Sequence, residues 1–225
     1  MTRLDRLRAR MEATGTGLVA LPPGAHMQWL LGFAPHPDER PCLLLVGPDR
    51  AGFVMPALNA DDARQHTDLP FWDWQDATGP AAALDAALQA IAPSPRRVTL
   101  DEAMRTDHGL LLLDSLPNVA RGFASETVGA LRMVKDADEL AALAENARIA
   151  DLAQAAVRAA IRPGMTETDL ADVARAAFAA HGARCEFAIV GAGANSAFPH
   201  HHTGSTVLKP GDALVAAIAA TPMEG

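Results

Sequence analysis

The chain has 225 residues, and 49% of them are apolar, which is enough for one large or two small domains with a real core. Its net charge of −8, from 19 basic and 27 acidic side chains, argues against a nucleic-acid or anionic-membrane partner, because no basic stripe is present to contact phosphates. The composition predicts a globular protein whose acidity serves solubility.

The start of the chain and its two cysteines bear on location. The first ten residues include four arginines, unlike a signal peptide, and no uncharged apolar run is long enough to span a membrane. Cys42 and Cys185 lie far apart and fit no metal-ligand spacing, so we interpret them as free thiols in a reducing compartment. We therefore expect a cytoplasmic protein.

Short apolar runs alternate with helix-like segments in the first half of the chain. The alternation predicts an α/β layer domain with a partly parallel sheet. Strands are predicted at Gly17–Leu21, Cys42–Val46, Gly52–Met55 and Arg97–Leu100. Helices are predicted around Leu4–Met11, Met27–Phe33, Asn59–Gln65, Pro80–Ile91 and Arg105–Leu113.

Several aromatic and histidine residues of this half are candidates for a functional site. Phe71, Trp72 and Trp74 form either an aromatic wall of a substrate site or a core patch between elements, and we prefer the core patch. The histidines stand alone in the sequence and are interpreted as surface or core residues: His26, His36, His66 and His108.

The second half begins with two predicted helices. Asp136, with Glu139 three residues later, suits a helix start, and this helix should run to about Ile161. Pro163-Gly164 should break it, and Thr166 should cap the next helix, which stops near Gly182. The apolar face of that second helix is expected to hold Leu170, Val173, Ala177 and Phe178.

A strand, a glycine-rich turn, a histidine run and a second strand follow. The strands are predicted at Phe187–Val190 and Ala213–Ala220, with a turn at Pro210-Gly211 between them. Adjacent residues of an extended segment point to opposite faces, so His200 and His202 can share a side. A metal site made from the three histidines alone is the less favoured interpretation, because a catalytic zinc takes ligands from more than one tight run.

Two pairs of motifs carry a family resemblance. The first pair is LRMVKDADEL at Leu131–Leu140 and RPGMTETDL at Arg162–Leu170. The second pair is GANSAFPH at Gly193–His200 and LKPGDALV at Leu208–Val215. Together they resemble the pita-bread metallopeptidases of family M24, in the branch of Xaa-Pro dipeptidases (prolidases) and Xaa-Pro aminopeptidases, which is related to metal-free creatinase. Trp29–Phe33 resembles the amino-terminal domain of the same enzymes.

The resemblance implies an α/β (α+β) architecture in two domains. Residues 1–127 would form a creatinase/prolidase-like amino-terminal domain, and residues 128–225 the first half of a pita-bread domain. In this family the amino-terminal domain often caps the site of a neighbouring subunit. The resemblance therefore implies a homo-oligomer, such as a dimer, and proline-containing peptides as partners.

The family's chemistry implies a metal centre that this sequence does not match. Family members hold two divalent metals such as Mn²⁺, which activate a water and polarise the scissile carbonyl. In register, the first metal-ligand aspartate falls on Ala217, and the remaining ligands would lie beyond Gly225. Since a methyl group cannot coordinate a metal, we expect no metal cofactor on this chain and no metallopeptidase activity.

His200 is the residue that the resemblance carries over to this chain. It matches the family's histidine that contacts the substrate, or transfers a proton in creatinase, and so is implied to be catalytic and substrate-binding, with His202 as a second substrate-binding residue. Two alternatives stay open. One is a non-catalytic binding or assembly module that dimerises with, or caps, a related subunit; the other is a metal-free creatinase-like hydrolase that uses His200.

Overall fold

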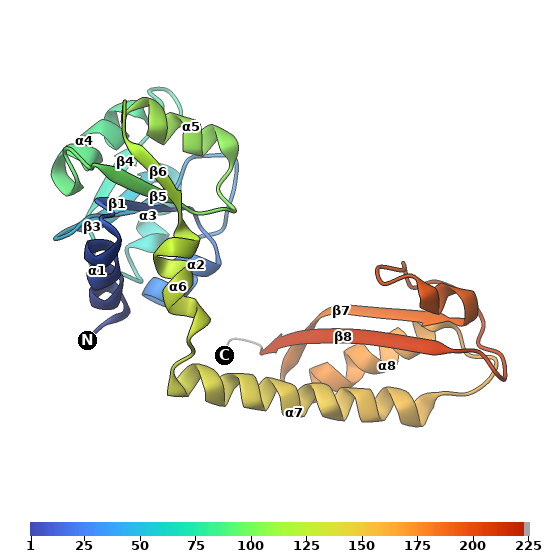
Figure 1. The fold of residues 1–225 in the computed structure, drawn as a ribbon. Helices are drawn as coiled ribbons and strands as arrows, with labels where there is room; N and C mark the ends of the chain where they lie inside the picture. The colour runs from blue at the N-terminus through green and yellow to red at the C-terminus, as the bar shows by residue number, and fades with distance from the viewer. Residues whose placement is uncertain (223–225) are drawn as a thin grey trace. The chain divides into compact units, whose positions relative to one another are not determined.

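The computed structural model describes residues 1–222, in two compact units, Met1–Val134 and the residues from Lys135 onward (Figure 1). Each unit combines helices with strands, which confirms the predicted α/β class. No helix in this part of the chain is both long enough and apolar enough to cross a membrane. The domain bounds at 127 and 128 remain a prediction, and the helix that follows them, α6 (Val128–Met133), adds Val128 to the core of the first unit.

The first unit is built on a six-stranded mixed sheet with the order β4-β3-β2-β1-β5-β6. β2 runs antiparallel to both of its neighbours, β1 and β3, whereas the other neighbouring pairs are parallel. The partly parallel sheet expected from the sequence is therefore present. The strands are β1 (Leu18–Leu21), β2 (Leu43–Val46), β3 (Ala51–Pro56), β4 (Phe71–Trp74), β5 (Arg97–Leu100) and β6 (Ala120–Phe123).

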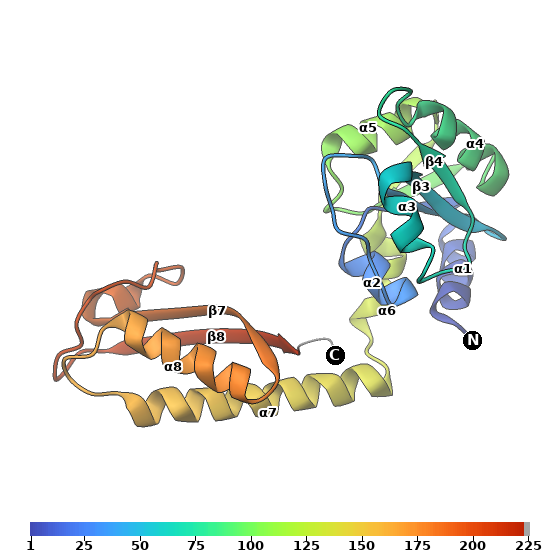
Figure 2. The same cartoon turned by 180° about the vertical axis from the view of Figure 1, so that it is seen from behind.

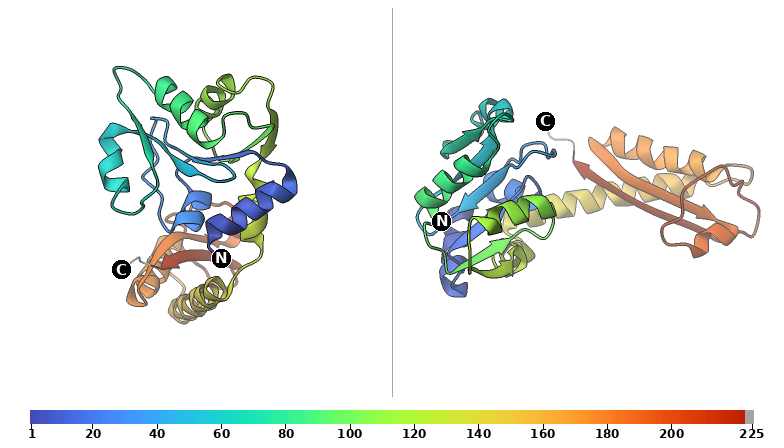
Figure 3. Two further views of the ribbon diagram at one scale, coloured as in Figure 1. Left: turned by 90° about the vertical axis from the view of Figure 1, so that its left-hand side faces the viewer. Right: turned by 90° about the horizontal axis from the view of Figure 1, so that it is seen from above.

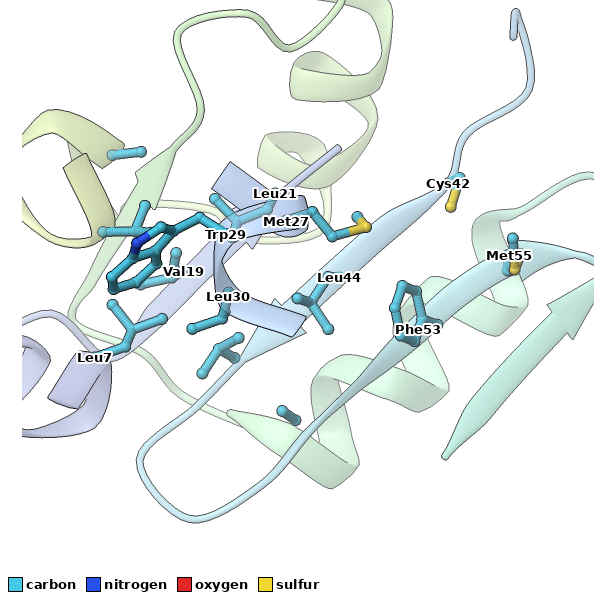
Figure 4. Close-up of a cluster of buried hydrophobic side chains, with 14 of the residues drawn as sticks. Leu7, Val19, Leu21, Met27, Trp29, Leu30, Cys42, Leu44, Phe53 and Met55 are labelled. Atoms are coloured by element: carbon cyan, nitrogen blue, oxygen red, sulfur yellow. The ribbon is translucent and has the colours of Figure 1, made fainter. Parts of the chain in front are cut away.

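Helices cover both faces of this sheet (Figure 3). β1 shows why its sequence is apolar throughout: Val19 and Leu21 pack on one face, while Leu18 and Ala20 pack on the other. Figure 4 shows the apolar cluster on the face of Val19 and Leu21, where Met27 and Leu30 lie close to the strands. The helices are α1 (Arg3–Thr14), α2 (Ala25–Leu31), α3 (Ala57–Ala63), α4 (Ala81–Ile91), α5 (Thr106–Asp114), the 3-10 turn η1 (Ala124–Glu126) and α6.

The aromatic residues of β4 belong to these two cores. Phe71 stacks on Phe53 with ring centroids 5.1 Å apart, on one face of the sheet. Trp72 and Trp74 pack on the other face, and the indole nitrogen of Trp74 donates a hydrogen bond of 3.0 Å to the carbonyl of Pro41. The aromatic cluster thus fills the space between elements, as the core interpretation requires.

The second unit is a β-hairpin covered on one face by two helices (Figure 2). Its elements are α7 (Ala137–Ala160), α8 (Glu167–Ala180), β7 (Ala183–Ala192), the 3-10 turn η2 (Gly193–Ala197) and β8 (Leu214–Pro222). Both helices begin with capping boxes, in which Asp136 and Thr166 accept hydrogen bonds from the backbone three residues later. The predicted helix starts are therefore confirmed.

Three strands differ from the prediction, and one of them is β4, whose residues were expected only to form an aromatic cluster. β7 has ten residues rather than the four of Phe187–Val190, because its first part pairs with β8 while carrying the exposed ion pair Arg184–Glu186. β6 was not predicted. Its sequence, ARGF, has no apolar alternation, and it forms a strand because it pairs with β5.

Gly47 offers a test of packing in the first unit. A Cβ at Gly47 would overlap the carbonyl oxygen of Ile91, so we expect Gly47→Ala to lower the free energy of unfolding by about 1–3 kcal/mol. Gly109 is the control, because it lies inside α5 and its Cβ would be 3.8 Å from the sulfur of Met104. Gly109→Ala should be neutral or stabilise by up to about 1 kcal/mol. Urea denaturation measures both, and equal effects of the two substitutions would contradict this packing.

Candidate functional site

The candidate site is the connection between β7 and β8, which carries the histidine run. Gly193 begins it with φ of 55°, a conformation that favours glycine, and its amide donates a 2.8 Å hydrogen bond to the carbonyl of Ala213. A Cβ at Gly193 would also lie 3.1 Å from the carboxylate of Asp212. The motif glycine and aspartate thus close the two ends of the connection against each other.

The carboxylate of Glu167 is the centre of this connection, although Glu167 belongs to the first turn of α8. Its side chain is fully buried. Oε1 accepts hydrogen bonds of 2.9 Å from the amide of Ala192 and from Nδ2 of Asn195. Oε2 accepts hydrogen bonds of 2.9 Å from Nε2 of His201 and of 3.0 Å from the amide of Gly204. One side chain therefore holds the connection at four points.

These contacts decide the ionisation of Glu167. Burial alone would raise the pKa of its carboxyl group, but hydrogen bonds from Asn195, His201, Ala192 and Gly204 outweigh burial and lower the pKa to about 2. The group is therefore a carboxylate at neutral pH. Because an ionised carboxylate only accepts hydrogen bonds, Nε2 of His201 carries the proton.

The three histidines of the run differ in their surroundings. His201 turns inward, with its side chain 18% exposed, and meets Glu167. The predicted site residues His200 and His202 are both exposed to solvent. His200 and His202 are thus accessible to solvent, whereas His201 between them is partly buried. The catalytic and substrate-binding roles of His200 and His202 stay predictions.

Ala217 lies on the face of the hairpin that the helices leave uncovered. It pairs with Ile189 of β7, while its neighbours Ala216 and Ile218 point to the helix side and pack there. We call this uncovered surface the open face. By strand alternation its residues are Phe187, Ile189, Val215, Ala217, Ala219 and Thr221, whereas Gly191 is buried against the backbone of Asn195. At the Thr221 end the hydroxyl donates a 2.7 Å hydrogen bond to the carboxylate of Glu186.

The open face tests whether a metal centre fits. Between Phe187 and Gly191 on β7, and between Val215 and Ala219 on β8, it presents no carboxylate and no imidazole. Phe187 and Val215 are 47% and 45% exposed there, so the surface is apolar. The carboxylate of Glu186, at the end of the face, already binds Arg184 and Thr221. The described residues of this face therefore do not offer the set of carboxylates that two divalent cations require.

A cluster of metal-type donors does occur in the first unit, whereas the predicted site belongs to the second. His26, Asp101 and Glu102 bring their ligand atoms within 4.8 Å of one another. Nη1 of Arg132, however, lies 2.7 Å from Nδ1 of His26, and a guanidinium can only donate. Burial lowers the pKa of His26, Asp101 opposes this effect, and Arg132 adds to it, so the ring is a neutral acceptor. We interpret the cluster as a hydrogen-bonded tie rather than a cation site.

Sequence reasoning missed both Glu167 and the partners of His26. For Glu167 a signal was present: it precedes Leu170 by three, Ala171 by four and Ala174 by seven residues, all of them buried on the same face of α8. A charged residue on that face needs partners, which marks it for attention. For His26 no local signal exists, since Asp101 and Arg132 are far away in the sequence.

Acid should remove the contribution of Glu167 to stability. The folded-state pKa is depressed, so the stabilisation is complete above the ordinary value of 4.5 and is lost as the pH falls towards about 2. At about 1.4 kcal/mol for each pH unit, the difference amounts to roughly 3 kcal/mol at neutral pH. We expect the wild-type chain to lose its advantage in unfolding free energy over Glu167→Gln across this range. Urea denaturation of both proteins at several pH values measures it, and a pH-independent difference between them would contradict the assignment.

The comparisons with known proteins agree with the geometry. Residues 3–134 match the family model described as the creatinase/prolidase N-terminal domain, and residues 141–223 match that of metallopeptidase family M24. "Probable dipeptidase PepE" of Mycobacterium tuberculosis, and the protein of the same name in Mycobacterium bovis, are 33% identical to this chain over an alignment of 225 residues. The alignment covers 97% of this chain and 59% of theirs.

Solved structures show the same fold. The crystal structure of dipeptidase PepE from Mycobacterium ulcerans superposes with a TM-score of 0.90 at 30% identity, covering 99% of this chain and 61% of that one. A prolidase from Thermococcus sibiricus shares the fold with a TM-score of 0.87 at 22% identity, covering 98% and 61%. The chain thus spans about three fifths of the length of its relatives. The chain belongs to the creatinase/prolidase N-terminal domain family, whose model matches more than half of it, and its residues 141–223 match the model of metallopeptidase family M24.

Proposed function

We propose that this chain supplies the substrate-recognition half of an Xaa-Pro dipeptidase-like site, with His200 in contact with a proline-containing dipeptide and His202 beside it. The observation that carries the proposal is the fixed connection between β7 and β8, which leaves these two histidines exposed while His201 is held inside. The family membership and the names of the relatives, dipeptidases and prolidases, support the substrate class.

The second part of the proposal is that this chain lacks metal chemistry of its own. The family resemblance implies that Ala217 takes the place of the first metal ligand, and Phe187 and Val215 expose apolar surface on the same face. We propose that this chain by itself does not build a two-metal centre and does not hydrolyse dipeptides by metal-activated water.

We also propose residues 1–127 and 128–225 as the two domains, and a cytoplasmic location, which free Cys42 and Cys185 support.

Ala217→Asp tests the metal part. A single carboxylate on an apolar face gains no partner, so we expect a loss of about 1 kcal/mol in unfolding free energy and no Mn²⁺-dependent activity. Release of proline from an Xaa-Pro dipeptide, with and without Mn²⁺, measures activity in the wild-type chain and in Ala217→Asp, and calorimetry measures Mn²⁺ affinity. Clear Mn²⁺-dependent turnover by the wild-type chain would refute the proposal.

A second candidate function is a binding or assembly module, and the open face favours it. Phe187 and Val215 expose apolar surface on a two-stranded sheet, and β8 is hydrogen-bonded on one edge to β7 alone among the described strands. Such surfaces recruit another chain. A homo-oligomer joined through this face would satisfy them.

Sedimentation tests the assembly proposal. We expect the wild-type chain to associate with increasing concentration, and Val215→Lys to shift it towards the monomer at least tenfold in dissociation constant, because a buried ammonium in the interface is unfavourable. Leu58→Lys is the control, since Leu58 is 78% exposed on α3 of the first unit. A monomer at all concentrations, or equal effects of the two substitutions, would exclude the open face as the contact.

A further inference from the structure

The first turn of α8 and the connection that carries the histidines hold each other in place. The amide of Glu167 donates to the carbonyl of Thr206 over 3.1 Å, and the amide of Thr168 donates to the carbonyl of Gly204 over 3.1 Å. The hydroxyl of Thr168 reaches the same carbonyl of Gly204 at 2.9 Å. The amide groups at a helix start have no partner inside the helix, so here the connection supplies their acceptors.

The Glu167 side chain completes this arrangement in the opposite direction. Where the helix backbone donates to the connection, the Glu167 carboxylate accepts from it, at Ala192 and Asn195 before the histidines and at Gly204 after them. Thr203 adds a tie to β7, because its hydroxyl accepts a 2.8 Å hydrogen bond from the amide of Val190. The segment between Asn195 and Thr203 is therefore held on both sides of the histidine run.

His201 sets which way the run faces. Its Nε2 meets Oε2 of Glu167 at 2.9 Å, so its ring points into the unit. His200 lies in a turn, in which the amide of His201 donates to the carbonyl of Phe198 over 3.1 Å, and both His200 and His202 are exposed. The choice of histidines that a ligand can reach is thus made by one buried contact.

We propose that Glu167 is a positioning residue: by holding His201 inward and closing the connection at Ala192, Asn195 and Gly204, it fixes the directions in which His200 and His202 are presented. The role rests on the proposed function for its meaning, since the ligand in question is the proline-containing dipeptide. Glu167 does not touch that ligand and acts through the two exposed histidines. Ordering an irregular segment costs conformational entropy at every residue, so the geometry depends on such contacts.

The experiment follows the ring-proton NMR signals of His200 and His202 in Glu167→Gln. The substituted amide can accept at its oxygen but presents its own donor to the remaining N–H groups, so two of the four contacts are lost. We expect the signals of both histidines to move to random-coil positions, and the affinity for glycyl-proline, followed by the same signals, to fall at least tenfold.

Asp169→Asn is the matched control. Asp169 lies in the same turn of α8 and belongs to its capping box with Thr166, without contacting the connection. The Asp169→Asn substitution weakens the start of α8, so this variant reports the effect of a general loss of stability. We expect its His200 and His202 signals to stay at their wild-type positions at a comparable loss of unfolding free energy. Equal movement of these signals in both variants would overturn the positioning role.

His201→Ala keeps the proposal testable if Glu167→Gln does not fold. It removes the inward contact and leaves the amides of Ala192 and Gly204 bound to Glu167. We expect the signals of His200 and His202 to lose their dispersion while exchange of those two amides stays slow. Wild-type signals of both histidines in His201→Ala would overturn the proposal.

The two proposals fail in different ways. If glycyl-proline moves no histidine signal in the wild-type chain, the proposed function is wrong. The role of Glu167 is then still decided by whether the His200 and His202 signals move to random-coil positions in Glu167→Gln. If the dipeptide binds and Glu167→Gln leaves both signals and affinity unchanged, the positioning role is wrong and the proposed function stands.

Discussion

A buried carboxylate governs the second unit. Taking a charge out of water is unfavourable unless hydrogen bonds replace its hydration. Glu167 receives four of them, one from the end of β7 and three from the connection that follows it. The cost of leaving any of these donors unsatisfied ties the end of β7, the turn η2, the histidine run and the start of α8 into one arrangement. The same charge explains why an irregular segment without regular backbone pairing keeps a defined shape.

Polarity is distributed unevenly between the two sides of the hairpin. The connection concentrates hydrogen bonds around Glu167, whereas the open face around Ala217 offers methyl groups and an exposed phenyl ring. Recognition of a ligand through imidazoles would depend on the hydrogen bonds of the connection. Binding of two cations would require carboxylates on the open face. Within the residues that match the M24 model, hydrogen-bonding groups thus gather at one end of the hairpin, whereas Ala217 on the open face is a side chain without lone pairs.

Sequence and structure agree where the signals are local. The capping boxes at Asp136 and Thr166 set the starts of α7 and α8, and apolar runs such as Leu43–Val46 mark strands buried on both faces. They disagree where pairing comes from far along the chain. β6 has no strand pattern of its own and depends on β5, and the partners of Glu167 lie 25 to 37 residues away. Motif matching located His200, but it gave no account of what holds it.

β1 has a consequence for the order in which the first unit assembles. It pairs with β2 on one side and with β5 on the other, and Leu18 lies opposite Val98, so the centre of the sheet joins segments some 80 positions apart. The β2–β3 hairpin can form early from neighbouring residues, whereas closure between β1 and β5 must wait until most of the unit has been synthesised. Until β5 has been synthesised, one edge of β1 has no partner strand, so an apolar strand of this unit is exposed during translation.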